Sequence, residues 1–251
     1  MGWAWWPLKK MGMNNPFQLK TNLDYQQLVS YWKGQSAKPS SETAFNGLMQ
    51  LAADSKVQNT IYHKDVVDAM FRQVNRSDAI AFKVHNINRE ALVYAVDYDL
   101  GPIGNAYFSK DSANYWVSSG KRVTWNSGWA YRNDGIDIEP CHDTLSNGFQ
   151  IADLQASEWL QYTIHTDESG LYNVQIRTFA KEGGEIALSV NGKPIASGTA
   201  VSASAQAWSV QKIENILLVR GENRIRLAAK SGAVSINYLK FNKQIVTGST
   251  N

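Results

Sequence analysis

The residues WLQYTIHTDESGLYNVQIRTF, from Trp159 to Phe179, decide the fold class. In both halves of this stretch apolar residues alternate with polar ones, and the apolar set is Leu160, Tyr162, Ile164, Tyr172, Val174 and Ile176. A period of two predicts β-strands, each with one face in a hydrophobic core. Trp159 has the parity opposite to Leu160, so we expect its indole to lie outside that core.

Similar short runs continue at intervals of roughly ten residues. They span residues 185–190, 208–213, 216–219, 223–228 and 234–241. Asn191-Gly192 supplies the positive φ angles of a tight hairpin, and Gly221 begins another turn. The series predicts a mainly β fold: a jelly-roll-like β-sandwich over residues 92–242, closed by its last strand and followed by a polar tail at 243–251.

The first part of the chain has a different pattern. Residues 2–11 form a short apolar burst that suits a buried strand. The expected helices span residues 23–33, a segment that begins at Pro39-Ser40-Ser41-Glu42, and residues 63–74. Helical spacing disappears near Glu90, so we expect a mostly α-helical part at 1–76 and a polar connector at 77–91.

The charge pattern limits the partners. The formal net charge is +3, and the lysines and arginines are scattered. This pattern disfavours nucleic acid and membrane, so we expect an uncharged or weakly charged ligand. Cys141 is the only cysteine, so no disulfide can form within the chain. The opening residues, MGWAWWPLKK, carry their lysines after the apolar residues and do not read as a secretory signal.

Aromatic residues and an acid gather between Gly128 and Tyr162, a stretch that includes Glu139 and Trp159. Loops on a rigid β scaffold often carry binding residues. An indole offers a flat apolar platform for the C–H face of a pyranose, and a carboxylate accepts hydrogen bonds from its hydroxyls. These residues therefore favour a sugar ligand.

The β region resembles carbohydrate-binding module family 6 over residues 92–242. The blocks that carry the resemblance are AVDYDLG at 95–101, YRNDGIDIE at 131–139, SEWLQYTI at 157–164, SGLYNVQIR at 169–177, AWSV at 207–210, GENRIRL at 221–227 and SINYLKF at 235–241. The resemblance implies a β-sandwich that holds a sugar on loops at one end, between two aromatic walls.

The resemblance also assigns the residues of that cleft. Trp159 matches the first wall, Trp208 the second wall, and Glu139 the acid. At the position of the family's asparagine this chain has Ser235, with Asn237 two residues later. That departure weakens one of the expected sugar contacts.

These assignments have structural alternatives. Either indole could fill an irregular core, Glu139 could cap a turn or pair with Arg132, and Ser235 could lie on a plain strand surface. A second aromatic set consists of Tyr115, Trp116, Trp125, Trp129 and Tyr131. Some members of the family have a second site on a concave sheet face, but we favour a covering role for this set.

The sequence disfavours a metal and a catalytic centre in the β region. The resemblance implies a structural calcium bound by an opening Glu-Ala-Glu segment, but Tyr94, Ala95 and Val96 stand there, so both acids that would bind the ion are missing and the calcium is left open. No metal-ligand spacing joins the four histidines His63, His85, His142 and His165. We expect the loop acids Asp137, Glu139 and Asp143 to be solvated or to hold a cation weakly rather than to catalyse.

Residues 1–76 resemble the end of a glycoside hydrolase family 5 barrel. The segments GWAWWPLKKM, NNPFQL and SYWKG carry this resemblance, which implies the last strand and closing helices of a (β/α)8 barrel, with Trp6 lining a sugar subsite. Retaining hydrolysis needs two carboxylates about 5 Å apart. In the family both are glutamates on strands that precede this segment, so we expect no enzyme activity from this chain.

The sequence thus predicts a noncatalytic, monomeric module that binds a plant or microbial β-glucan or xylan and targets an attached hydrolase, in a secreted or cell-envelope parent protein. One alternative is the C-terminal part of a retaining endo-β-glucanase whose catalytic glutamates lie upstream of Met1. The others are hydrolysis by the loop acids and a purely structural adhesion sandwich. Turnover would indicate an enzyme, and retention without turnover a binding module.

Overall fold

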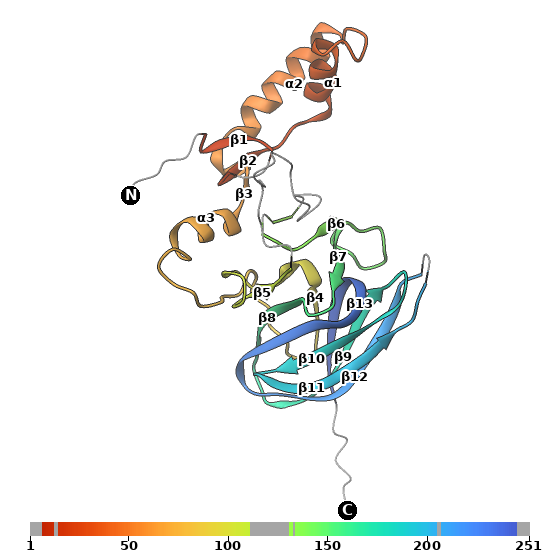
Figure 1. Cartoon of the computed structure of the whole chain (residues 1–251). Helices are drawn as coiled ribbons and strands as arrows, with labels where there is room; N and C mark the ends of the chain where they lie inside the picture. Colours follow the sequence, from red (N-terminus) through yellow and green to blue (C-terminus); the bar gives the residue numbers. More distant parts are fainter. Residues whose placement is uncertain (1–6, 13–14, 111–130, 133, 205–206, 245–251) are drawn as a thin grey trace, which may run out of the picture. The chain divides into compact units, whose positions relative to one another are not determined.

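The computed structural model describes residues 7–12, 15–110, 131–132, 134–204 and 207–244 (Figure 1). The chain divides into two compact units, Met1–Val67 and Asp68–Asn251, and each is described by itself. The division falls within helix α3 (Lys64–Phe71). It therefore lies earlier in the chain than the predicted boundary near Glu90. Among the described residues, every helix is too short or too polar to cross a bilayer.

The first unit contains a small sheet and two longer helices. β1 (Lys9–Met11) runs parallel to β2 (Phe17–Leu19), and β2 pairs antiparallel with β3 (Ile61–Tyr62). Between β2 and β3 lie α1 (Leu23–Trp32), α2 (Ser41–Asp54) and the 3-10 turn η1 (Val57–Asn59). Residues 1–6 lie outside the described part, so Trp6 and much of the predicted strand at 2–11 have no described placement.

Both long helices begin where their sequences predict. The Asn22 Oδ1 accepts a hydrogen bond from the Tyr25 N–H at 2.9 Å, and the Ser40 Oγ accepts one from the Thr43 N–H at 3.0 Å. The two helices cross closely at Gly47, where an added Cβ would lie only 2.6 Å from the backbone nitrogen of Tyr25. A larger residue at position 47 would therefore push the helices apart.

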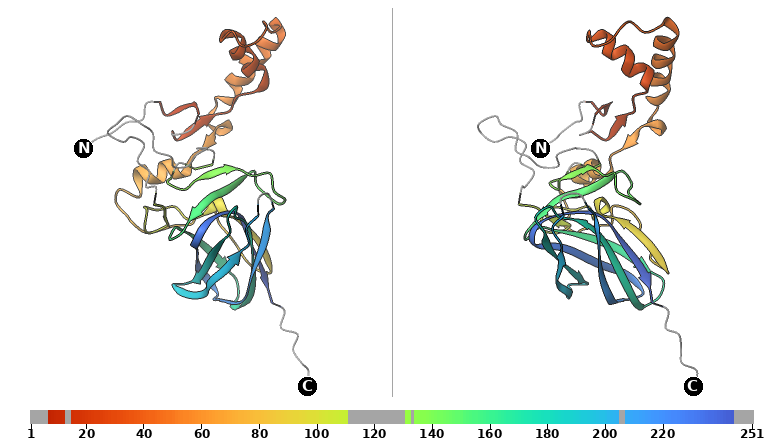
Figure 2. Two further views of the ribbon diagram at one scale, coloured as in Figure 1. Left: turned by 45° about the vertical axis from the view of Figure 1, so that its right-hand side comes forward. Right: turned by 90° about the vertical axis from the view of Figure 1, so that its right-hand side faces the viewer.

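The second unit is a curled β-sheet that forms a sandwich. Its elements are β4 (Glu90–Tyr94), η2 (Ala95–Asp97), β5 (Tyr107–Phe108), β6 (Ile138–Pro140), β7 (Phe149–Gln155), β8 (Trp159–Thr166), β9 (Gly170–Phe179), β10 (Gly184–Val190), β11 (Lys193–Val201), β12 (Ser209–Leu218) and β13 (Gly221–Lys243). Both views in Figure 2 show these strands lying against one another around a common interior. The predicted mainly β sandwich is therefore confirmed.

Strand β13 belongs to both layers of the sandwich. Its first half pairs with β8 and β10, in the order β11–β10–β13–β8–β5, which we call the β8 layer. Its second half pairs with β4, β7 and β9, in a layer that also holds β12 and β6 and that we call the β9 layer. The two inner faces supply the hydrophobic core, including the fully buried Tyr162, Tyr172 and Phe241.

The structure confirms the predicted hairpin and joins two pairs of predicted strands. Asn191 and Gly192 have φ angles of 51° and 79° between β10 and β11. The runs at 208–213 and 216–219 form one strand, β12, with a register shift beside Asn215, whose φ is 58°. The runs at 223–228 and 234–241 likewise form the single strand β13.

Residues 77–91 are bound to the sandwich, whereas the sequence predicted a polar connector. The Ile80 N–H donates to the Leu100 carbonyl at 2.9 Å, and the Ile87 N–H donates to the His165 carbonyl at 2.7 Å. Ile87 is fully buried and belongs to the core cluster. Single apolar residues in a polar segment give no periodic signal, so their burial could not be predicted from the sequence.

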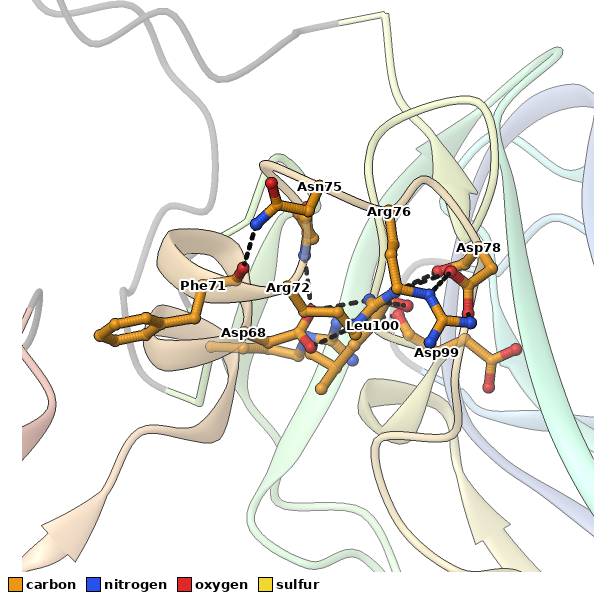
Figure 3. A network of polar contacts seen from close by, with 10 residues as sticks. Asp68, Phe71, Arg72, Asn75, Arg76, Asp78, Asp99 and Leu100 are labelled. Atoms are coloured by element: carbon orange, nitrogen blue, oxygen red, sulfur yellow. Dashed lines mark hydrogen bonds and ion pairs between the residues drawn. The ribbon is translucent and has the colours of Figure 1, made fainter. Parts of the chain in front are cut away.

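Arg72 fastens the end of α3 to the loop that follows η2 (Figure 3). Its Nε and Nη2 atoms donate to the two carboxylate oxygens of Asp68 at 2.6 and 2.8 Å. The same guanidinium donates to the carbonyls of Asp78 and Leu100, the latter at 3.2 Å. The side chains of Arg72 and Asp68 are 17% and 7% exposed, so this ion pair is largely shielded from water.

Replacing Arg72 with methionine is expected to lower the free energy of unfolding of this unit by about 2 kcal/mol, because the shielded Asp68 carboxylate loses the two hydrogen bonds and the positive charge of the guanidinium. Urea denaturation measures the loss. The matched control is Arg76→Met, since Arg76 is 68% exposed and pairs only with Asp78 among the described residues. We expect the control to change stability by less than about 0.5 kcal/mol. Equal losses in both variants would contradict the role of Arg72 in holding the end of α3 to the loop that follows η2.

Candidate functional site

Trp159 begins β8 and lies on the outer face of the β8 layer. The alternating residues Leu160, Tyr162 and Ile164 are at most 1% exposed, whereas Trp159 is half-buried. The predicted opposite parity is therefore observed, and the indole does not fill the core. Its accessible part faces the outside of the sandwich.

A row of small and aromatic side chains crosses this outer face. Strand pairing places Ala187 beside Ala228, and Ala228 beside Trp159. On the other side of the indole, Phe108 of β5 is its partner. Directly paired residues lie on the same face of a sheet, so the row is continuous. The two alanines are too small to cover the indole.

A polar row lies next to the aromatic one. Ser189, Arg226 and Gln161 are paired across β10, β13 and β8. The guanidinium carbon of Arg226 lies 3.7 Å from the centre of the Trp159 ring, within cation–π distance. Its Nη2 donates to the Gln161 Oε1 at 3.5 Å. Arg226 therefore joins the polar row to the aromatic row.

Asp99 orients Gln161 from the segment that lies beside β8, where the Asp99 N–H donates to the Gln161 backbone carbonyl at 2.7 Å. The Asp99 carboxylate accepts hydrogen bonds from the Gln161 Nε2 at 3.1 Å and from the N–H and hydroxyl of Thr163, each at 2.7 Å. Burial raises the pKa of Asp99, although these hydrogen bonds favour the charged form. Because Asp99 holds the amide nitrogen, the carbonyl oxygen of Gln161 is left for Arg226.

Two adjoining hollows lie over the polar row. The first has a volume of about 470 Å³ and is lined by Gln161, Ser189, Asn191, Gly192, Arg224 and Arg226. The second, of about 340 Å³, shares Gln161, Arg224 and Arg226 and adds Ser77, Asp78, Ala79, Gly104 and Asn105. We call the two hollows together the β8-layer groove. Volumes of about 300–1,000 Å³ are typical of small-ligand sites, so the groove has room for a sugar unit.

Trp208 lies on the other layer. It precedes β12, it is half-buried, and its ring centre lies 5.8 Å from that of Phe179 at an interplanar angle of 43°. Phe179 has the same parity on β9 as the outward Arg177, so this pair lies on the outer side of the β9 layer. Among the described residues no ring contact joins Trp159 to Trp208. Their facing arrangement across one sugar stays a prediction.

Glu139 occupies a third position. It is exposed on β6 and pairs with Gln150 of β7. The strand order places β6 and β12 at opposite edges of the β9 layer, with β7, β13 and β9 between them. Strand order alone therefore separates the predicted acid from Trp208, and Trp159 belongs to the other layer.

Ser235 and Asn237 are buried, and Ser235 binds the backbone of β7 whereas Asn237 binds the loop at Asp143 and Thr144. Ser235 is 4% exposed, and its hydroxyl accepts a hydrogen bond at 3.2 Å from the N–H of Asp153, which has a φ of 45°. Asn237 is 0% exposed and donates to the Asp143 carboxylate at 2.9 Å and the Thr144 carbonyl at 3.2 Å. A sugar could reach Ser235 or Asn237 only if the backbone at Asp153 or the loop at Asp143 and Thr144 moved.

The carboxylate of Asp143, one of the predicted loop acids, forms an ion pair with an arginine. Arg177 donates to both carboxylate oxygens of Asp143 at 2.8 Å. The Arg177 guanidinium holds the pKa of Asp143 below its usual range. This bidentate pair suits a structural tie rather than proton transfer.

The residues at the start of the sandwich do not fit a calcium ion. Ala95 and Val96 are fully buried and supply no carboxylate. Asp97 is 2% exposed, and its carboxylate already binds the Lys83 ammonium at 3.1 Å and the Tyr131 hydroxyl. Within the described ranges, no group of three or more His, Cys, Asp or Glu side chains is placed to hold a metal.

The second aromatic set is described only at Tyr131. Its ring centre lies 5.2 Å from that of Phe149, and both rings pack against the core. This placement agrees with the covering role that we favoured for Tyr131. Tyr115, Trp116, Trp125 and Trp129 lie outside the described residues.

The polar row beside Trp159 was not predicted from the sequence. Gln161 shares the outward parity of Trp159 on β8, and Arg226 has the corresponding parity in the run at 223–228. Parity was therefore readable for each strand. The register that pairs Arg226 with Gln161 could not be read from the sequence, because nothing in either run determines which strands are neighbours.

Comparison with known proteins supports a carbohydrate-binding module. Residues 132–241 match the family model described as "Carbohydrate binding module (family 35)". The matched model has a different family number from the family 6 motifs that the sequence resembles, and it begins at residue 132 rather than 92. Among curated proteins, none matches this chain.

Three solved structures are similar to parts of the chain. A family 6 module from Clostridium stercorarium in complex with cellobiose is 12% identical, with a TM-score of 0.41, over 64% of this chain and 98% of that one. A β-1,3-glucan-binding family 6 module from Bacillus halodurans is 17% identical, with a TM-score of 0.41, over 64% and 99%. A family 35 module from Cellvibrio japonicus is 14% identical, with a TM-score of 0.41, over 62% and 94%.

Proposed function

We propose that this chain binds a β-linked polysaccharide of the β-glucan or xylan type without cleaving it, and that Trp159 on the β8 layer is its main sugar platform. The observation that carries the proposal is the match of residues 132–241 to a carbohydrate-binding family model. The β-glucan or xylan class rests on the sequence motifs at 131–139, 157–164 and 235–241.

The outer face of the β8 layer has the chemistry that a sugar needs. A pyranose that stacks on Trp159 removes an apolar C–H face from water, and the polar row beside it offers partners to the hydroxyls. Arg226 contacts the indole, so a ring stacked on Trp159 would lie beside a guanidinium, and the Ser189 hydroxyl lies on the far side of Arg226 in the same row. The groove continues across three strands, which suits an extended chain.

The described groove favours binding over hydrolysis. Asp78 is the one carboxylate among the lining side chains of the groove, and it is paired with Arg72 and Arg76. Asp99 binds Gln161, a lining residue of the groove, but it is 1% exposed and also accepts hydrogen bonds from Thr163. Glycoside hydrolysis needs a pair of carboxyl groups that flank the scissile bond. These two acids do not offer such a pair.

Retention on polysaccharide tests this function. We expect the full chain to be retarded in gels that contain soluble β-glucan or xylan and to be pulled down by the insoluble forms. A reducing-sugar assay on the same substrates should show no turnover, and albumin serves as the control for nonspecific retention. Release of reducing sugar would indicate an enzyme. Absence of retention on every polysaccharide would indicate a structural sandwich and overturn the proposal.

The resemblance of residues 1–76 to the end of a hydrolase barrel supports a targeting role. In this view the module holds an attached glycoside hydrolase on its insoluble substrate in a secreted or cell-envelope protein. Helices α1 and α2 expose Trp32, Phe45 and Met49, at 61%, 63% and 55%. Side chains of this kind fit helices that pack against further parts of a larger catalytic domain.

A further inference from the structure

A segment of the second unit, residues 80–88, lies against the end of β8, and we call it the strap. Near its start, the Ile80 N–H donates to the Leu100 carbonyl at 2.9 Å. Near its end, the His165 N–H of β8 donates to the His85 carbonyl at 2.8 Å, and the Ile87 N–H donates to the His165 carbonyl at 2.7 Å. Backbone hydrogen bonds to β8 therefore hold the end of the strap.

His85 adds a titratable ring at this point of attachment. The side chain is partly buried, and its Nε2 atom is buried with no hydrogen-bond partner among the described residues. A neutral imidazole can leave this nitrogen without a proton. A charged imidazole carries an N–H there, and a buried donor that lacks an acceptor is costly. The surroundings of Nε2 therefore suit the neutral ring.

The groups around the ring act on its charge in both directions. Burial is the largest effect and lowers the pKa of His85, and the Lys83 ammonium lowers it further. Asp97, through its carboxylate and its backbone carbonyl, and Asp99 act in the opposite direction. The Asp97 carboxylate is shared, because it also binds Lys83 at 3.1 Å and the Tyr131 hydroxyl. Burial prevails, so the pKa of His85 lies below its ordinary value.

We propose that His85 is a pH-sensitive latch: its neutral ring keeps the end of the strap on β8, and a proton taken up at Nε2 in weakly acidic solution releases that end. A released ring can place both of its N–H groups in water. The latch goes beyond the proposed function, because it concerns the attachment of a segment of the chain and needs no ligand.

The direction of the pH dependence follows from the lowered pKa of His85. The released strap binds a proton more readily than the attached strap does, so attachment is strongest above about pH 6.5 and weakens as the pH falls. Burial raises the pKa of Asp99, so protonation of Asp99 favours the folded form and acts in the opposite direction. Asp143 and Glu168 have lowered pKa values, and their contributions are lost only below about pH 4.

Amide hydrogen exchange of the full chain tests the latch. After correction for the intrinsic pH dependence of exchange, the protection factors of the Ile87 and His165 amides should fall several-fold between about pH 7.5 and about pH 5. The Val174 amide, on a strand that is paired on both sides, reports opening of the whole sandwich and should keep its protection. His85→Leu should show equal protection of Ile87 and His165 at both pH values. His85→Gln is a second variant that cannot ionise, in case leucine disturbs the packing.

Two other histidines of the same unit provide matched controls. His142 is exposed and the His165 side chain is 54% exposed, so His142→Gln and His165→Gln should keep the wild-type fall in protection. No fall in the wild-type chain, or a fall that persists in both His85 variants, would refute the latch. An equal fall at Val174 would indicate opening of the whole sandwich and would also refute it. None of these outcomes bears on polysaccharide binding, which retention tests separately.

Discussion

Replacing Trp159 with alanine is expected to abolish detectable binding to polysaccharide. The substitution removes the platform on which a pyranose would stack, together with the apolar area that the sugar would bury. We expect a loss of about 2 kcal/mol in binding free energy, which is roughly a 30-fold weaker affinity. Affinity electrophoresis in soluble β-glucan and xylan measures the change. The protein should still fold, because Trp159 lies on the outer face and not in the core.

Trp208→Ala is the matched control for this result. Trp208 is also half-buried, and Trp208→Ala also removes an indole. The Trp208 ring, however, lies against Phe179 on the other layer. If Trp159→Ala alone loses binding, the sugar lies on the β8 layer. If both variants lose binding, the two indoles form the walls of one cleft, as the sequence predicts. Loss in Trp208→Ala alone would refute the β8-layer platform.

The largest loss of stability is expected from Arg132→Met. Arg132 is 0% exposed and donates to the Asp134 carboxylate at 2.7 and 3.0 Å, to the Asp99 carbonyl at 3.0 Å, and to the Tyr98 carbonyl. Its guanidinium carbon also lies 3.6 Å from the centre of the Tyr98 ring and 4.7 Å from that of Phe82. Methionine can fill part of the space, but it removes the hydrogen bonds that the guanidinium donates to these oxygens.

We expect Arg132→Met to lower the free energy of unfolding by about 3–5 kcal/mol, the usual range when one partner of a buried ion pair is removed. Urea denaturation followed by circular dichroism measures this loss. The control is Arg224→Met, because the Arg224 side chain is 55% exposed and its pair with Glu222 is open to water. That variant should stay within about 1 kcal/mol of the wild type. A loss below about 1 kcal/mol in Arg132→Met would contradict the structural role.

The sequence predicted those features that depend on local pattern. Alternation placed Tyr162 in the core and Trp159 outside it, and the hairpin at Asn191 follows from the preference of Asn-Gly for positive φ angles. Ser40 caps its helix as predicted. Each of these properties is decided within a few residues, so a single sequence is enough to read it.

The continuity of β13 could not be read in this way. The sequence Lys230-Ser231-Gly232 is polar and ends in glycine, so it reads as a turn between two strands. In the structure Gly232 has a φ of 70°, and Lys230 and Ser231 are exposed. In the structure the backbone continues past Gly232 and changes partners from β8 to β9. An added Cβ at Gly232 would lie 2.2 Å from the Gly183 carbonyl oxygen, so close approach of another strand requires this glycine.

Only part of the candidate site could be predicted from the sequence, because the rest depends on contacts between residues far apart in the chain. The sequence identified Trp159 as an outward aromatic residue, but it also grouped Glu139, Ser235 and Asn237 with it. Their positions depend on which strands are neighbours and on which loops cover them, and both depend on contacts far apart in the chain. The companions of Trp159 in the structure are Arg226 and Gln161, which strand register brings beside it.

A single strand shared by both layers has a bearing on how this sandwich comes apart. Residues 221–228 of β13 are bonded to β8, and residues 235–243 of the same strand are bonded to β9. Detaching β13 from one layer breaks a central set of strand hydrogen bonds in that layer. It also loosens the other half of β13, which is bonded to the other layer. We therefore expect the two sheets to unfold together as one cooperative unit.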